Sequence, residues 1–230
     1  MIETNAKKHI FFQEIAYLLG IFLIELSISL MTKADFGLSM IIAPAYVLHL
    51  KISEFLPFFT IGMASYTLQL LLIISIILIR RKFKLSYFLA FVTSVVCGLL
   101  LDAINICLSG VIFSALAVRI IFFFVGVVIC AFGVSLMFRT YIAPEAYDLF
   151  VKELSSHFNV KVSRFKLAYD LSSLAVAVIL SFTLFGLGSL NGIGVGTVVC
   201  ALLNGMLIGG FGKLLDKHFE FRPALKFVKK

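Results

Sequence analysis

Apolar side chains fall in six long runs that are separated by short polar segments. Each run is about as long as the roughly 20 apolar residues that an α-helix needs to cross the hydrocarbon core of a bilayer. The pattern therefore predicts an all-α, polytopic membrane protein with six transmembrane helices and no large domain outside the bilayer. The six runs are residues 11–31, 57–79, 86–108, 120–138, 167–187 and 192–212.

The first run is longer than the apolar core of a signal peptide, which is about 7–15 residues. It also contains Glu14 and Glu25, and it ends in L-M-T-K without a cleavage pattern of small residues. We therefore interpret it as a retained membrane helix.

Several short motifs occur twice, in the same order and at similar spacing. S-L-M at 29–31 recurs at 135–137, and I-A-P-A-Y at 42–46 resembles I-A-P-E-A-Y at 142–147. These matches predict two three-helix repeats, residues 1–110 and 111–230, within a single membrane domain. Because three spans is an odd number, the second repeat enters the membrane from the opposite side, as in many inverted-repeat transporters.

A short Pro-containing segment follows the first helix of each repeat. It is too short to cross the bilayer, and its proline suits the first turn of a helix. If the segments are re-entrant, their helix N-termini face the protein interior and favour an anion. If they are interfacial, they lie on the two membrane surfaces, and the sequence leaves both alternatives open. The motif residues are Pro44, Tyr46, Pro144, Glu145 and Tyr147.

Composition and charge agree with a membrane protein. The chain is 61% hydrophobic and only 14% charged, whereas soluble domains carry about 25% charged residues. The net charge is +8, but all lysines and arginines except Lys33, Lys51 and Arg119 lie on one side of the predicted spans. Basic residues prefer cytoplasmic loops, so we predict cytoplasmic termini, the lipid bilayer as the partner, and no nucleic acid.

Ionisable residues within or beside the spans are candidates for a binding site, because such residues usually face the protein interior or a watery cavity. Glu25 and Asp102 are predicted at similar depth, where they could share a proton or bind a cation, or each could cap or hydrogen-bond a neighbour. A local ion pair is predicted between Lys166 and Asp170, which are four residues apart on one helix. The candidate substrate or ion ligands are Glu25, Lys33, Asp102, Arg139 and Asp148.

The glycine-rich segment G-I-G-V-G-T at 192–197 lacks the spacing of a nucleotide-binding loop and opens a membrane helix. We therefore interpret it as a site of close helix packing, which is predicted for Gly194, Gly196, Gly205 and Gly209. The four cysteines lie in apolar runs and behave as small buried residues. No metal site, cofactor or catalytic set is predicted, and the protein is not expected to be an enzyme.

Five stretches resemble the YczE/YyaS/YitT-like family of bacterial integral membrane proteins. They are K-A-D-F-G-L-S (33–39), P-A-Y-V-L (44–48), F-G-V-S-L-M (132–137), K-L-A-Y-D-L-S (166–172) and G-I-G-V-G-T (192–197). The resemblance implies a location in the bacterial cytoplasmic membrane and an acidic residue after the proline of each half. Asp148 matches the second acid, whereas no acid closely follows Pro44.

The inverted symmetry and the carboxyl groups within the spans favour a small transporter or permease for an unidentified small molecule or ion, with its site between the repeats. Two alternatives remain open: a substrate-binding membrane subunit that needs an ATPase partner, and a scaffold or accessory protein that transports nothing. A second copy of the chain or another membrane protein is also left open as a partner.

Overall fold

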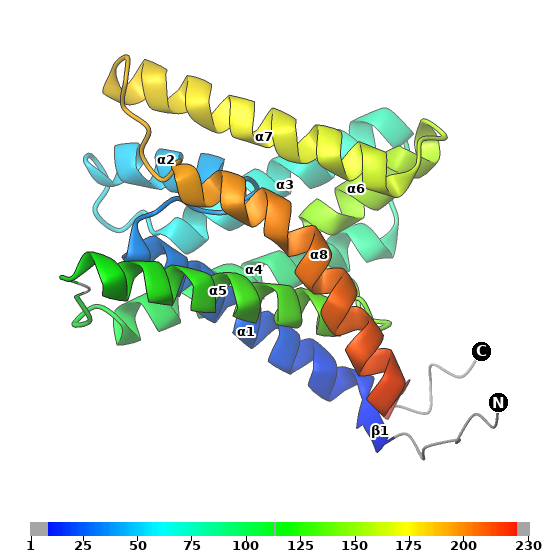
Figure 1. Ribbon diagram of the computed structural model, residues 1–230. Helices are drawn as coiled ribbons and strands as arrows, with labels where there is room; N and C mark the ends of the chain where they lie inside the picture. Colours follow the sequence, from blue (N-terminus) through cyan, green and yellow to red (C-terminus); the bar gives the residue numbers. More distant parts are fainter. Residues whose placement is uncertain (1–8, 113, 225–230) are drawn as a thin grey trace.

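The computed structural model describes residues 9–112 and 114–224, which form eight helices and one pair of short strands (Figure 1). In chain order these are β1 (His9–Phe12), α1 (Gln13–Ala34), α2 (Ala43–Ser53), α3 (Ile61–Arg80), α4 (Leu85–Cys107), α5 (Leu116–Met137), α6 (Ala146–His157), α7 (Val162–Phe185), α8 (Val195–His218) and β2 (Phe219–Arg222).

The six predicted spans are confirmed. The helices α1, α3, α4, α5, α7 and α8 are each long and apolar enough to cross a membrane, so the chain is a multi-pass membrane protein. Their ends differ from the apolar runs by a few residues for local reasons. The second run begins at residue 57, whereas α3 begins at Ile61, because the Thr60 hydroxyl caps this helix by accepting the Met63 N–H at 3.1 Å.

The two shorter helices, α2 and α6, begin at the two proline motifs. The first turn of α2 is buried at Ala43, Pro44 and Ala45, and the first turn of α6 is buried at Ala146 and Tyr147. Both helices therefore start inside the protein, which agrees with re-entrant segments better than with helices lying flat on its surface.

Helices α1 and α5 pack against each other more extensively than any other pair of helices, and a close glycine contact lies between them (Figure 1). A Cβ atom added to Gly20 of α1 would lie 2.9 Å from Met137 Cγ and 3.1 Å from the carbonyl oxygen of Gly133. Only a residue without a side chain lets the two backbones approach so closely.

The same contact recurs with the helices exchanged. A Cβ atom added to Gly126 of α5 would lie 2.8 Å from Met31 Cγ and 3.2 Å from the carbonyl oxygen of Ser27. Each of these three residues lies 106 positions along the chain from its counterpart in the first contact, the separation that relates the two S-L-M motifs.

The remaining helices pack beside this pair or on one another. Helix α4 packs against α1 as α8 packs against α5, and α2 packs against α7 as α6 packs against α3. Two pairings are not matched within the described residues. Helix α3 packs along α4, whereas α7 and α8 diverge from the loop that joins them and make no comparable contact (Figure 1). Helix α4 also packs against α6, whereas α8 makes no comparable contact with α2.

Two of the family-like motifs meet in the structure. The N–H of Gly196 donates to the carbonyl of Phe36 at 2.9 Å, and the N–H of Leu38 donates to the carbonyl of Gly192 at 2.9 Å. A Cβ atom on Gly194 would collide with the same Phe36 carbonyl. Gly194 and Gly196 are therefore both closely approached: Gly194 by the loop at Phe36, and Gly196 by this loop and by the Phe123 ring of α5.

The packing predicted for Gly205 and Gly209 is wrong within this chain. Both residues are exposed, and nothing lies within 4 Å of a Cβ atom added to either. The physical reason is the divergence of α7 and α8, which leaves this face of α8 without a neighbouring helix.

The sequence did not predict the strand pair. β1 and β2 run parallel, with His9 opposite Phe219 and Phe12 opposite Arg222. The ring of Phe11 meets the rings of Phe219 and Phe221 edge-on. This pairing joins the beginning of α1 to the end of α8.

Candidate functional site

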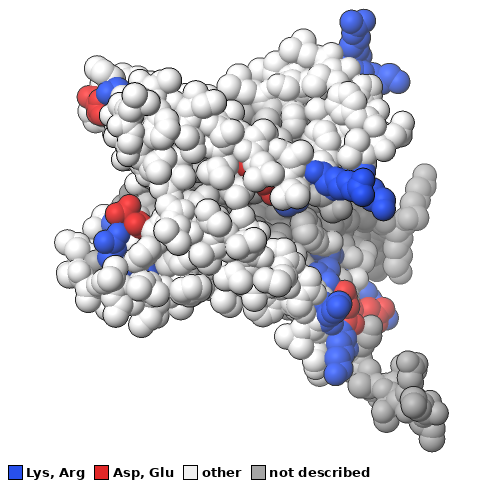
Figure 2. Space-filling view, turned by 45° about the horizontal axis from the view of Figure 1, so that its top comes forward, with Lys and Arg blue, Asp and Glu red and all other residues white. Residues whose placement is uncertain are grey.

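A cavity of about 360 Å³ lies between the first and second halves of the chain. Pro44 and Ala45 at the start of α2 line it together with Glu145 and Tyr147 at the start of α6. Most of the remaining lining is apolar and comes from α1, α3, α5 and α7. Figure 2 shows a hollow across one face of the molecule, with acidic atoms visible deep within it.

Glu145 is held in place from two other helices. Gln69 of α3 donates from Nε2 to Glu145 Oε2 at 3.0 Å, and Ser94 of α4 donates to Gln69 Oε1 at 2.6 Å. The N–H of Ala146 donates to the Ser94 hydroxyl at 3.2 Å. The start of α6 is thus joined to α3 and α4 by a chain of hydrogen bonds that orients the Glu145 carboxyl group.

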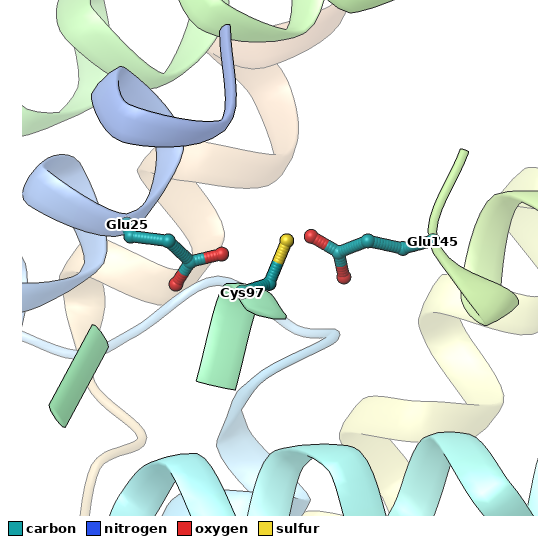
Figure 3. Close-up of side chains that lie close together, drawn as sticks. All are labelled: Glu25, Cys97 and Glu145. Carbon is teal, nitrogen blue, oxygen red and sulfur yellow. The ribbon is translucent and has the colours of Figure 1, made fainter. Parts of the chain in front are cut away.

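The carboxyl groups of Glu25 and Glu145 lie on either side of the Cys97 thiol (Figure 3). One ligand atom from each of the three side chains lies within 4.8 Å of the other two. Glu25 of α1 is 3% exposed and Cys97 of α4 is 2% exposed, while Glu145 is partly buried at the cavity. The cluster joins one acidic side chain from each half of the chain.

Burial of these two carboxyl groups carries an electrostatic cost. Removing a carboxylate from water costs several kcal/mol even after relaxation, and no lysine or arginine among the described residues forms an ion pair with Glu25 or Glu145. Protons or a bound cation must therefore offset the charge of this cluster.

A second polar group lines the cavity where α6 meets α7. Lys166 Nζ lies 3.7 Å from Asp148 Oδ1, and the Tyr147 hydroxyl donates to Asp170 Oδ1 at 2.5 Å. The ion pair predicted between Lys166 and Asp170 is therefore wrong. Both side chains interact across to α6, where each finds a closer partner than its neighbour along α7.

Asp102 of α4 accepts hydrogen bonds from the start of α3. Its Oδ2 accepts a hydrogen bond from the Thr60 hydroxyl at 2.6 Å, and its Oδ1 accepts the N–H of Gly62 at 2.9 Å. Of the two alternatives drawn from the sequence, the structure shows the capping one, here at the start of α3. Lys33 lies in the last turn of α1 and is partly exposed.

Arg139 is not among the side chains that line the cavity. Its guanidinium group donates to both carboxylate oxygens of Asp216, each at 2.6 Å, and to the carbonyls of Ser135 and Gly212. Arg139 therefore ties the end of α5 to the end of α8.

Another ion-pair cluster lies at the far end of α6, away from the cavity. Glu153 accepts hydrogen bonds from Lys84 Nζ at 2.7 Å and from the Tyr87 hydroxyl at 3.1 Å, and Arg80 Nε lies 3.3 Å away. Partial burial alone would raise the pKa of Glu153, but these donors and the nearby positive charges hold the pKa below its usual value.

The structure brings together only part of the predicted site. Glu25, Glu145, Tyr147, Asp148 and Pro44 lie at the cavity or directly beside it, whereas Asp102 and Arg139 have separate partners. Sequence reasoning missed Cys97 as a partner of the two glutamates. Its spacing from them carries no motif, because the three residues come from three distant segments.

The motif resemblance is confirmed by comparison with known proteins. The chain is 28% identical over 208 residues to the uncharacterized protein YyaS of Bacillus subtilis, an alignment that covers 88% of this chain and 94% of the relative. No solved structure matches the chain. Because residues 11–213 match the family of unknown function DUF6198, the protein belongs to that family.

Proposed function

We propose that this protein is a small membrane transporter or permease whose ligand site lies between two inverted three-helix repeats. The observation that carries the proposal is the convergence of α2 and α6, one from each half, on the same cavity. Half-helices that begin around a site near the bilayer midplane are a recurring feature of secondary transporters.

Two further observations support the repeat. The contacts of Gly20 and Gly126 are equivalent under a shift of 106 positions, as expected where two equivalent helices cross at a pseudo-two-fold axis. The packing of α2 on α7 and of α6 on α3 is also reciprocal.

The orientation follows from the basic residues. Their clustering around the chain ends, in the loop 81–84 and between residues 139 and 166 favours cytoplasmic termini in a bacterial plasma membrane. The start of α6 then approaches the cavity from the cytoplasmic side and the start of α2 from the opposite side.

The unequal packing of the two halves suggests how access alternates. Helix α3 lies closed against α4, whereas α7 stands apart from α8. In an inverted repeat the two halves exchange these arrangements as one rocks against the other. A second state would then close α7 on α8 and separate α3 from α4.

The cavity carries Glu145 and Asp148 as well as Lys166, beside a large apolar surface. Helix N-termini alone favour an anion, but the acidic side chains at the start of α6 oppose one. The site therefore suits a small cationic or zwitterionic solute with an apolar part, or a cation.

Two-sided access to the cavity tests the proposal without knowledge of the substrate. Ser65 lines the cavity, so we would label Ser65→Cys with a membrane-impermeant maleimide in right-side-out and inside-out vesicles. A transporter predicts labelling from both sides. Access from one side only would favour a binding subunit or a scaffold and would count against transport.

Ser29→Cys supplies the matched control for this experiment. Ser29 is fully buried, does not line the cavity and donates to Asn105 at 2.5 Å. It should resist the reagent from both sides. Both variants carry Cys107→Ser, which removes the exposed native thiol, and Cys130→Ala, which removes the native thiol that lines the cavity.

A further inference from the structure

We propose that Glu25, Cys97 and Glu145 form a binding site for a divalent cation of borderline or soft character, such as Zn²⁺. The site adjoins the cavity of the proposed transporter, but the inference goes beyond transport because binding can be measured on the isolated protein. It assigns a metal-ligand role to a cysteine that the sequence identified only as a small buried residue.

The geometry of the cluster suits a single ion. Donor atoms in a tetrahedral zinc site lie about 3.5 Å apart, given bond lengths of about 2.0–2.3 Å. The Cys97 Sγ atom and the carboxylate oxygens of Glu25 and Glu145 are already within 4.8 Å of one another. Side-chain rotation alone can bring them to one ion, with the thiol between the two carboxyl groups (Figure 3).

Glu25 supplies an independent indication of a ligand. Its side chain is 3% exposed and points toward Cys97 and Glu145 (Figure 3). Among the described residues, no hydrogen-bond donor outside the cluster contacts its carboxyl group. Polar groups so deeply buried are normally paired, and a cation bound between the two carboxylates satisfies both.

The sulfur atom selects the class of metal. Mg²⁺ and Ca²⁺ prefer oxygen ligands alone, whereas Zn²⁺ and neighbouring transition metals accept cysteine sulfur together with carboxylate oxygen. Three protein ligands leave a fourth coordination position, and Glu145 lines the cavity. The open position would therefore face the cavity, where water or a second ligand can bind.

The surroundings of Glu145 resemble the outer shell of a metal site. Gln69 donates to one of its oxygens, and Ser94 orients Gln69 in turn. Such partners hold a ligating carboxylate in position, and their loss weakens metal binding by about 10–100-fold.

Cobalt titration tests the site directly. The full chain would be purified in detergent, freed of its affinity tag, stripped with a chelator and titrated with Co²⁺, then with Zn²⁺ as competitor. We expect one Co²⁺ per chain, a sulfur-to-cobalt charge-transfer band and displacement by Zn²⁺. Cys97→Ser should abolish the band, and Glu25→Gln should weaken binding by at least the 10–100-fold seen for outer-shell partners.

Thiols elsewhere in the chain provide the controls. Cys200 is buried against Met31, with the two sulfur atoms 3.7 Å apart, and Cys107 is exposed. Cys200→Ala and Cys107→Ser should leave both the band and the affinity unchanged. If Cys97→Ser fails to fold, Glu145→Gln at its partly exposed position serves as the ligand variant.

The proposal is overturned if the parent binds no Co²⁺ or Zn²⁺, or if Cys97→Ser and the glutamate variants bind as tightly as the parent. In that case protons alone neutralise the cluster. Metal binding with one-sided access at Ser65 would refute the proposed transport and retain this site. Two-sided access at Ser65 without metal binding would refute this site and retain the proposed transport.

Discussion

Replacing Gly20 with alanine would place a methyl group 2.9 Å from Met137 Cγ and 3.1 Å from the carbonyl oxygen of Gly133. Non-bonded carbon atoms prefer separations of about 3.5–4.0 Å. The Met137 side chain can move aside, but the Gly133 carbonyl belongs to the α5 backbone, so the two helices must separate slightly.

The magnitude follows from two opposing terms. Overpacking a tight contact costs about 1–3 kcal/mol, while alanine gains up to about 1 kcal/mol over glycine in a helix interior. We therefore expect Gly20→Ala to lower the free energy of unfolding by about 1–2 kcal/mol. Gly126→Ala should lower it by a similar amount, because its methyl group meets equivalent atoms at 2.8 and 3.2 Å.

Gly205→Ala is the matched control. The added methyl group meets nothing within 4 Å on the exposed face of α8. Its only expected effect is the gain in helix propensity, so this variant should be as stable as the parent or slightly more stable.

Unfolding can be followed in mixed detergent micelles with increasing dodecyl sulfate. The chain has no tryptophan, but Cys97 and Cys200 are buried, do not line the cavity and react with a fluorogenic maleimide only on unfolding. Cys107→Ser and Cys130→Ala remove the exposed thiol and the cavity thiol from every variant. The reasoning is refuted if Gly20→Ala and Gly126→Ala match the parent, or if Gly205→Ala is destabilised as strongly as they are.

Three other substitutions test separate contacts by the same unfolding assay. Asp102→Ala leaves two donors at the start of α3 without their acceptor and should cost about 2–3 kcal/mol, while Co²⁺ binding persists; loss of binding with stability intact would contradict the capping role. In Gly194→Ala the added methyl group collides with the Phe36 carbonyl and should lower the dodecyl sulfate concentration at the unfolding midpoint. An unchanged midpoint would show that the loop at Phe36 moves aside at little cost. Glu153→Gln should cost about 1 kcal/mol at pH 7. Because the pKa of Glu153 is lower in the folded protein than in the unfolded chain, its contribution to stability is fully present above about pH 4.3. This contribution disappears as the pH falls through the folded pKa. If the variant is still less stable than the parent below the folded pKa, the reasoning is refuted.

The spans were predictable because lipid imposes length and apolarity on each helix independently of its neighbours. The recurrence of S-L-M was also visible in sequence, and in the structure Met31 and Met137 each lie against a glycine of the other helix, Gly126 and Gly20. The proline motifs were located correctly because their residue pattern marks helix starts.

The site was only partly predictable, because depth in the membrane does not determine which face of a helix a residue occupies. Glu25 and Asp102 were predicted at similar depth, yet Glu25 faces Cys97, while Asp102 contacts the start of α3. The packing predicted for Gly205 and Gly209 was wrong for a related reason. Local sequence indicates that a helix can be approached closely, but the angle between α7 and α8 decides whether anything approaches it.

The parallel pairing of β1 with β2 places the two described ends of the chain close together. The backbone that enters α1 runs beside the backbone that leaves α8, so a short linker can join the described ends, and new termini can be opened between α4 and α5. Such a circular permutant would carry the two halves in reversed order. Its folding would show whether the arrangement of the helices depends on which half is synthesised first.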